Sequence, residues 1–461
     1  MSIQESNLIT RRHFARILAL PVGALVLGSA LPAWAKKKKK KQEDEKPTAS
    51  TPADPADPNY ETKIIWESGE VYEKDFNGKT NVRAYNNHAY MVVVLPDKQV
   101  MILKAPFDGG KAQLLPLLNV TAGTDPHRFY DIGIDSLGYI HVVGDMHGSA
   151  HVKHWISKKP ENISEFVSTS DLGANKRPGG YDVTYPHFFR SPDGVLYHCI
   201  RCANPVWGIC LSVLDAKTQT WTVLGAEIPA GVLKNKHAKM AINKPITAWE
   251  DNGEGGNFGY TQPHAHITWD KNKRMHLVLG LLNENAPAGH GHTGSDVLYA
   301  YSDDGGKTFH RGNGSKIELP MRAEAGPHQA DVVYSKHDGP PPWVGLDPSI
   351  HIDDKGRPVV GFLVHKSASR SRKMVLENGR WTEQAQSTDA QSPDVATKPK
   401  DEDEDEGAPD IIEKLPHLPY GIRRLDVYYL RDTGNYLYFA EPTPGNKIRI
   451  ALSKPVKAKA E

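Results

Sequence analysis

The sequence predicts an all-β protein, a β-propeller with seven blades or, as the alternative, six. Two observations predict this fold class. The chain shows almost no helical periodicity, and its short apolar runs are punctuated by turns built on Asp with Gly or Lys. In addition, one unit recurs, in which an apolar strand, an Asp turn and a second apolar strand follow one another: DIGIDSLGYIHVV, HFFRSPDGVLYHCI, HITWDKNKRMHLVL, SIHIDDKGRPVVGF and VYYLRDTGNYLYFA, with MVVVLPDKQVMIL as a weaker copy.

The recurrence of this unit favours a propeller over other all-β folds. One blade alone cannot bury both of its faces, whereas blades stacked around an axis bury them and expose only short edges. Ring closure often joins strands from both ends of a chain in one blade, which is hard to see in a sequence. With such a composite blade added to the recognisable copies, seven blades are expected. A pair of stacked β-sandwiches, the alternative architecture, explains the strands but not their recurrence.

Residues 1–35 are predicted to be a twin-arginine signal peptide. Arg11 and Arg12 precede an apolar run over residues 17–31, and the A-W-A sequence at 33–35 is a cleavage site. The apolar run is short for a membrane span, so a cleaved signal is favoured over the alternative of an N-terminal membrane anchor. Because the twin-arginine route exports folded proteins, we expect a bacterial protein of the periplasm or the medium.

The rest of the chain is predicted to form one large domain. Residues 36–60 are a Lys-rich disordered linker, and residues 61–458 form a single β-propeller catalytic domain. A disordered acidic insertion is expected at about 387–408, where the sequence is of low complexity and ends in DEDEDE. The 56 basic and 55 acidic residues give a formal net charge of +1, and nothing in this balance favours nucleic acid as a partner.

Two further motifs are predicted to be structural. The segment SDDGGKTF at 302–309 matches the Asp-box S-x-D-x-G-x-T-[WF], in which Asp caps a tight turn, Gly supplies a positive φ and the aromatic ring packs between strands. The three cysteines, Cys199, Cys202 and Cys210, lie in β-like runs, and three is an odd number. We therefore expect packing residues, or one optional disulfide, in place of a disulfide framework.

Four polar residues stand at the edges of β-like runs, each beside a turn, and together they predict a site for a sugar acid. They are His127, His147, Tyr185 and Arg201. A guanidinium pairs bidentately with a carboxylate, whereas a phenol and imidazoles can move protons. Each residue taken singly is more often a packing side chain or a solvated charge, and it is their combination that indicates a site.

The segments around these residues carry a family resemblance. IGIDSLGYIHVVGDMHGSAHVKHWISKKPENISEF, VTYPHFFRSPDGVLYHCIR and VLDAKTQTWTVLG resemble the BNR-4 group of β-propeller proteins, which includes the propeller-type ulvan lyases of polysaccharide lyase families 24 and 25. The resemblance is good over roughly residues 75–310 and weaker elsewhere. Its more specific elements are GDMH, TYPHFF and an arginine that ends the following hairpin.

The resemblance implies roles for individual residues. His127 matches the histidine ahead of the strand pair ending in GYIH, and His147 matches the histidine of the D-M-H segment. Tyr185, in T-Y-P, matches the catalytic tyrosine, and Arg201 matches the arginine that neutralises the substrate carboxylate.

A later blade supplies candidates for substrate binding. Tyr260 and His264, both in NFGYTQPHAHI, are the residues expected there. The group commonly has a W-R pair after the strand that corresponds to MHLVL, whereas this chain has GLLNENAPAGHGH. Substrate contacts in that region therefore differ from the pattern of the group.

The resemblance implies a lyase that cleaves a 4-linked uronic-acid-containing, sulfated, ulvan-like polysaccharide by β-elimination. Arg201 would stabilise the charge that develops at the carboxylate, and Tyr185 or a histidine would move the protons. Two alternatives are a non-catalytic glycan-binding propeller and a sialidase-like glycoside hydrolase. The hydrolase would need a Tyr–Glu nucleophile pair and three arginines on the carboxylate, and the chain has no Arg-Ile-Pro opening.

The expected partner is an acidic polysaccharide, without nucleic acid or membrane contact after signal cleavage, and the protein is expected to be a monomer. The chemistry requires no cofactor. Propeller lyases of this kind often hold a structural metal ion, and His276, His290 and His292 are the candidate ligands for zinc or calcium. The alternative for the last two is that they are exposed histidines of a Gly-rich loop.

Overall fold

The computed structural model describes the following residues: 60–70, 82–125, 128, 130–149, 152–169, 183–202, 208–227, 244–247, 259–260, 267–283, 294–322, 326–335, 343–344, 348–365, 369–384, 422–430, 435–442 and 447–455. Chain contacts divide the protein into a unit of residues 1–50 and a unit of residues 51–461, and all described residues belong to the second. The predicted signal peptide, nearly all of the linker and the acidic insertion lie outside the described residues.

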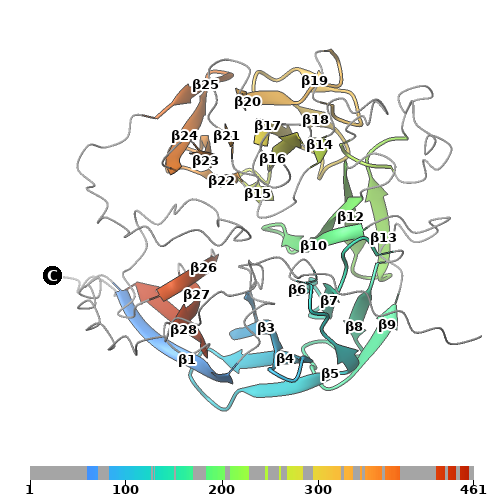
Figure 1. Ribbon diagram of the computed structural model, residues 1–461, viewed down its shortest axis with the longest axis vertical. Helices are drawn as coiled ribbons and strands as arrows, with labels where there is room; N and C mark the ends of the chain where they lie inside the picture. Colours follow the sequence, from blue (N-terminus) through green and yellow to red (C-terminus); the bar gives the residue numbers. More distant parts are fainter. Residues whose placement is uncertain are drawn as a thin grey trace, which may run out of the picture. The chain divides into compact units, whose positions relative to one another are not determined.

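The described residues form β-strands and no helix, which confirms the all-β prediction. Three sheets of four antiparallel strands follow one another along the chain (Figure 1). The first sheet holds β2 (Arg83–Tyr85), β3 (His88–Val94), β4 (Gln99–Pro106) and β5 (Gln113–Thr121). The second sheet holds β6 (Tyr130–Ile134), β7 (Ile140–Gly144), β8 (His154–Ser157) and β9 (Phe166–Thr169). The third sheet holds β10 (Val183–Arg190), β11 (Leu196–Cys202), β12 (Gly208–Asp215) and β13 (Thr220–Leu224).

A fourth four-stranded sheet, the terminal sheet, joins the two ends of the described chain. Its order is β1-β28-β27-β26, with β1 (Tyr60–Glu70) antiparallel to β28 (Lys447–Pro455), then β27 (Asn435–Pro442) and β26 (Ile422–Leu430). Figure 1 shows β1 beside β28. A sheet that joins strands from both ends of the chain is the feature that the predicted ring closure requires.

The central part of the chain departs from the pattern of separate four-stranded sheets. Twelve strands form one connected sheet there, because the two-residue strand β21 pairs with β17 on one side and with β23 on the other. The strands are β14 (Gly259–Tyr260), β15 (Ile267–Trp269), β16 (Met275–Asn283), β17 (Gly294–Ser302), β18 (Phe309–His310), β19 (Lys316–Ile317), β20 (Asp331–Ser335), β21 (Trp343–Val344), β22 (Ser349–Ile352), β23 (Pro358–His365), β24 (Ser369–Glu377) and β25 (Arg380–Glu383).

The recurring Asp turn has one geometry in three of the described copies. In Asp135, Asp270 and Asp353, Oδ1 accepts hydrogen bonds of 2.8–3.0 Å from the backbone N–H groups two and four residues later. Ser191 takes the same place in the third sheet, where its Oγ accepts the N–H of Val195 at 3.0 Å. A short polar side chain that satisfies its own turn is the physical reason for the repeat.

The Asp-box is structural, as predicted. Asp304 accepts hydrogen bonds from the N–H groups of Lys307 and Thr308, and Gly306 has a φ of 89°. Phe309 is fully buried in the core between sheets.

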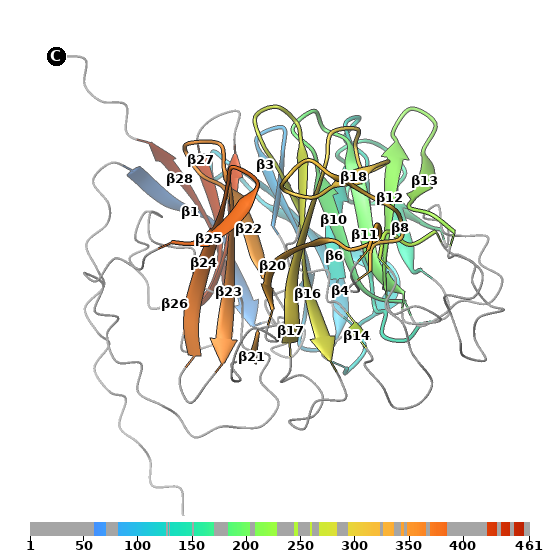
Figure 2. The same cartoon turned by 90° about the horizontal axis from the view of Figure 1, so that it is seen from above.

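The core lies between neighbouring sheets, since successive residues of one strand face different neighbours. In β3, Ala89, Met91 and Val93 pack with residues of the terminal sheet, whereas Tyr90, Val92 and Val94 pack with residues of the second sheet. The second and third sheets share a further cluster, and the third sheet packs in the same way on the twelve-stranded sheet. Side chains that alternate between two apolar faces are typical of sheets buried on both sides. Figure 2 shows that most strands of these sheets lie roughly along one common axis, in alternating directions.

The described cysteines are packing residues. Cys199 and Cys210 are buried, and they belong to clusters on opposite faces of the third sheet. The side chain of Cys202 lies outside the described residues.

No helix among the described residues is long and apolar enough to cross a membrane.

Candidate functional site

Tyr185 lies at a β-bulge in β10, the edge strand of the third sheet. Thr184 pairs with Arg201 and His187 pairs with Cys199, so two residues of β10 stand opposite one residue of β11. The residue after Tyr185 is proline, which has no N–H to give to the ladder and is tolerated at bulges. The bulge takes the side chain of Tyr185 out of the regular alternation of the strand.

The backbone at Tyr185 is strained. Its φ is +55°, in the left-handed region that a tyrosine rarely adopts, and the side chain is only 2% exposed. Such a conformation costs about 1–3 kcal/mol and persists only where the surroundings determine it. Strain of this kind concentrates at functional sites.

Arg201 brings a buried positive charge onto this phenol. It lies on β11 directly opposite Thr184 and is 5% exposed. Its Cζ stands 4.5 Å from the centroid of the Tyr185 ring, which is a cation–π contact. The two residues, sixteen positions apart in the sequence, therefore meet across one hairpin.

His147 lies in the loop after β7, and this loop is bonded to the start of β10. Gly148 N donates to Thr184 Oγ1 at 3.0 Å, and Ser149 exchanges two backbone hydrogen bonds with Val183, at 3.1 and 3.2 Å. His147 is thus attached to the residues that immediately precede Tyr185. The imidazole is about one third exposed, which leaves it accessible to a ligand.

A carboxylate orients the ring of His147. Nδ1 of His147 lies 2.5 Å from Asp125 Oδ2, and an acceptor at this place favours the tautomer with the hydrogen on Nδ1 and the lone pair on Nε2. Asp125 also lies 3.8 Å from Arg128, and Arg128 reaches Asp145 at 3.6 Å. Asp145 in turn pairs with Lys153. This chain of alternating charges holds the loop that carries His147.

His127 stands between Asp125 and Arg128 and lies outside the described residues. The partner of His147 was missed by the sequence reasoning, although a signal for it exists. Both D-P-H at 125–127 and D-M-H at 145–147 place an aspartate two residues before a predicted catalytic histidine. A repeated D-x-H pattern could have indicated that carboxylates serve these imidazoles.

The predicted metal ligand His276 is a buried residue of β16. Its Nδ1 lies 2.7 Å from the hydroxyl of Tyr299, and its Nε2 lies 3.7 Å from Asp270. Burial lowers the pKa of His276 to about 4, against the opposing effect of Asp270, so the ring is neutral at pH 7. His290 and His292 lie outside the described residues, and the residues that are described contain no group of three His, Cys, Asp or Glu placed to hold a metal ion.

The predicted substrate-binding residues belong to the segment around β14. Tyr260 lies in β14 and pairs with Leu282 of β16, but its side chain is outside the described residues, as is the whole of His264. The structure therefore brings together Tyr185, Arg201 and the loop of His147. The positions of the other candidate side chains stay predictions.

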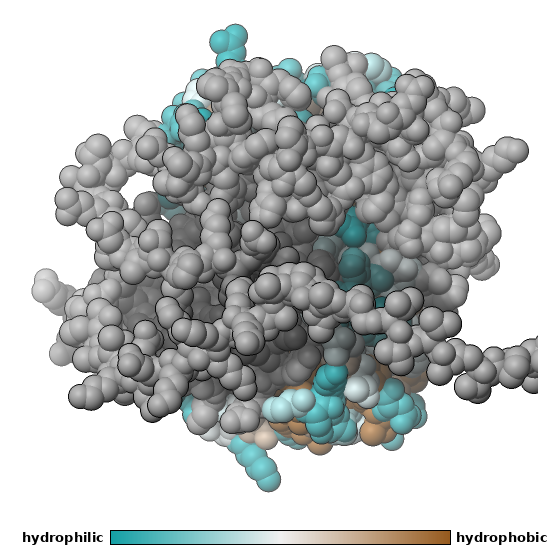
Figure 3. Space-filling model, in the orientation of Figure 1, coloured by the Kyte–Doolittle hydropathy of each residue, from teal (hydrophilic) through white to brown (hydrophobic). Residues whose placement is uncertain are grey.

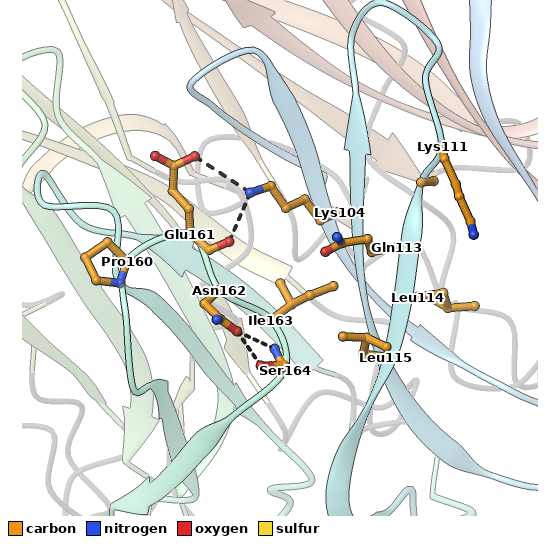
Figure 4. A pocket seen from close by; sticks show the side chains of 11 residues that line it. Lys104, Lys111, Gln113, Leu114, Leu115, Pro160, Glu161, Asn162, Ile163 and Ser164 are labelled. Carbon is orange, nitrogen blue, oxygen red and sulfur yellow. Dashed lines mark hydrogen bonds and ion pairs between the residues drawn. The ribbon is translucent and has the colours of Figure 1, made fainter.

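A cavity between the first two sheets is lined by other residues. It has a volume of about 820 Å³ and is lined by β4, β5 and the loop before β9 (Figure 4). Lys104 crosses it and binds the carbonyl oxygen of Glu161 at 3.0 Å. Figure 3 shows apolar residues among hydrophilic ones at the lower edge of the molecule, where β5 lies in Figure 1. One exposed apolar side chain of β5 is Leu118, which is 66% exposed. The lining includes none of the predicted site residues.

Several solved structures align with this chain. The polysaccharide lyase Uly1 aligns with a TM-score of 0.50 and 12% identity, over 81% of this chain and 88% of its own. An ulvan lyase of polysaccharide lyase family 25, solved with -[GlcA(1-4)Rha3S]- bound, aligns with a TM-score of 0.49 and 14% identity, over 82% of this chain and 83% of its own. A thermostable family-43 glycoside hydrolase aligns with a TM-score of 0.33 and 11% identity, over 74% and 98%.

None of the curated proteins matches the chain. The family model described as "BNR repeat-containing family member" matches residues 87–388, which extends well beyond the segments that carry the resemblance in the sequence. The chain belongs to this BNR repeat-containing family, as the sequence predicted.

Proposed function

We propose that this protein is a polysaccharide lyase that cleaves a 4-linked, uronic-acid-containing polysaccharide of the sulfated, ulvan-like kind by β-elimination. The observation that carries the proposal is the contact of the buried Arg201 guanidinium with the ring of Tyr185 at 4.5 Å. A buried cation beside a phenol on a strained bulge is an arrangement for binding a carboxylate and moving a proton next to it.

The elimination needs three events at one sugar. The C5 proton of a uronate is scarcely acidic while the adjacent carboxylate is fully charged, so the charge that develops at C5 must be stabilised. Arg201 supplies a fixed positive charge for this, and a fixed charge in a buried site costs no reorganisation during the reaction. A base then removes the C5 proton, and an acid protonates the leaving O4.

Tyr185 and the histidines divide the proton transfers. Tyr185 holds one proton and can donate it to O4 or, as phenolate beside Arg201, accept one from C5. His147, whose Nδ1 is bonded to Asp125, presents Nε2 as a base for the epimer whose C5 proton lies on the opposite face. His127 is the second imidazole of this proposal, and Tyr260 and His264 are assigned to substrate binding.

Further parts of the proposal concern the molecule as a whole. The sheets close into one propeller of seven blades that spans residues 61–458. The mature protein is a monomer exported by the twin-arginine route to the periplasm or the medium. Its chemistry needs no cofactor, and a structural zinc or calcium ion is held by the loop of His290 and His292, with His276 as the third candidate ligand.

The test is incubation of the mature protein with a panel of uronate polysaccharides. A lyase forms unsaturated uronates that absorb in the ultraviolet. A hydrolase of the sialidase type would release reducing ends without this absorbance, and a glycan-binding propeller would bind the polymer and release nothing.

A matched pair of variants assigns the role of Tyr185. Tyr185→Phe removes only the phenolic oxygen, so turnover should fall by the roughly 10²–10⁴-fold that general acid–base groups supply. Tyr197→Phe makes the same change at a buried tyrosine of β11 that packs between the third sheet and the twelve-stranded sheet, and should keep turnover. Wild-type elimination by Tyr185→Phe would refute the assignment.

A further inference from the structure

A buried carboxylate joins the edge strands of three sheets close to the bulge that carries Tyr185. Asp131 lies on β6, the edge strand of the second sheet, and is 1% exposed. Arg83 reaches it from β2, the edge strand of the first sheet, and Phe188 reaches it from β10, the edge strand of the third. The sheets thus meet at one charged group.

The distances describe a closed set of hydrogen bonds. Arg83 Nη2 lies 3.1 and 3.2 Å from the two carboxylate oxygens of Asp131. The backbone N–H of Phe188 donates to Asp131 Oδ2 at 2.8 Å, and the carbonyl of Phe188 accepts from Arg83 Nη2 at 3.0 Å. His187 Nδ1 lies 3.4 Å from the same carboxylate oxygen.

The ion pair therefore supplies hydrogen-bond partners that a neighbouring strand would otherwise give to β10. An edge strand leaves every second N–H and C=O without a ladder partner, and such groups are costly to bury unpaired. At Phe188 the carboxylate accepts the N–H and the guanidinium serves the C=O. Burial would raise the pKa of Asp131, but Arg83, His187 and the Phe188 N–H outweigh it and lower that pKa, so the carboxylate is charged.

These contacts stand on one side of the bulge, and a second set stands on the other. Before Tyr185, Thr184 and Val183 are bonded to Gly148 and Ser149. After it, Phe188 is held by Asp131 and Arg83. Tyr185 keeps its φ of +55° only if the backbone is held on both sides of it, since a relaxed strand would return to a negative φ and move the side chain.

We propose that Asp131, paired with Arg83, is a positioning residue that sets the place of the Tyr185 phenol above Arg201. The proposal rests on the proposed function for its effect on turnover, whereas its effect on the position of Tyr185 is independent of it. In this role Asp131 acts through the backbone of β10, and it contacts neither Tyr185 nor the substrate directly.

The kinetic test is a double-mutant cycle. Asp131→Asn keeps the shape of the side chain but removes its charge, and turnover should fall about 10- to 100-fold, as small misplacements of reacting groups do, with KM little changed. In the Tyr185→Phe background the same substitution should cause no further loss, because the group it positions is already gone. An equal loss in both backgrounds would show a merely structural role and overturn the proposal.

The chain offers a matched control. Asp135→Asn changes a buried aspartate of the same sheet, which bonds its own turn and Gln219 and has no contact with β10 among its hydrogen bonds. It should keep the turnover of the wild type. Where Asp131→Asn alone fails to fold, Asp131→Asn with Arg83→Met removes the unpaired buried cation as well, and should restore folding without restoring turnover.

A measurement without substrate separates this proposal from the proposed function. With 3-fluorotyrosine incorporated, the ¹⁹F resonance of residue 185 is identified by its loss in Tyr185→Phe. That resonance should shift in Asp131→Asn and stay in Asp135→Asn, whether or not the protein cleaves a uronate polymer. An unmoved resonance in folded Asp131→Asn would overturn the proposal, and its shift in a protein that forms no unsaturated product would overturn only the lyase assignment.

Discussion

Acidification is expected to destabilise the fold through buried histidines. His154 is 2% exposed and stacks on His141, with His154 Nε2 3.1 Å from His141 Nδ1. Burial, with smaller contributions from His141 and His198, lowers the pKa of His154 well below 6.5, and burial lowers the pKa of His276 to about 4. These rings stay neutral in the folded protein and bind protons on unfolding.

The direction and size of the effect follow from that difference. The stability that neutral His154 and His276 contribute is present above pH 6.5, and it is lost as the pH falls below that value, because only the unfolded chain then takes up protons. One pH unit below the pKa of the unfolded chain, each ring lowers the free energy of unfolding by about 1.4 kcal/mol. The two rings together therefore lower it by about 3 kcal/mol near pH 5.5.

Urea unfolding followed by tryptophan fluorescence, at about pH 7.5 and about pH 5.5, measures this loss. In His154→Gln the loss between the two pH values should be about 1.4 kcal/mol smaller than in the wild type, because one proton fewer is bound on unfolding. His88→Gln, at a half-buried histidine outside this cluster, controls for the chemistry of the change. If His154→Gln and the wild type lose the same stability, the histidine argument is wrong.

Three further predictions concern other parts of the chain. Arg201→Lys should recover little of the turnover lost in Arg201→Ala, because an ammonium cannot reproduce forked pairing with a carboxylate; equal activity of Lys and Arg in the ultraviolet assay would contradict this. Replacing Arg11 and Arg12 with Lys should leave folded precursor in the cytoplasm, and normal export in a fractionation experiment would exclude the twin-arginine route. Asp304→Ala removes the acceptor of two turn N–H groups in the Asp-box and should lower the free energy of unfolding by about 1–2 kcal/mol, read as a lower Tm, without changing KM.

The strand pattern and the turns could be predicted from the sequence because they depend on local chemistry. An aspartate such as Asp135 satisfies its own turn within four residues, and alternation along β3 decides which side chains are buried. The same locality made Tyr185 and Arg201 predictable as neighbours, since a hairpin joins them. Family membership followed from the same segments.

Only the tertiary structure showed how these residues are held. The bulge at Tyr185, the pairing of Asp125 with His147 and the meeting of Arg83, Asp131 and β10 join segments far apart in the chain. No periodicity records such contacts, because they depend on which sheet edges come together when the sheets pack. The sequence by itself therefore determined the elements and the candidate residues, whereas the packing of the sheet edges decided the geometry that would let them act.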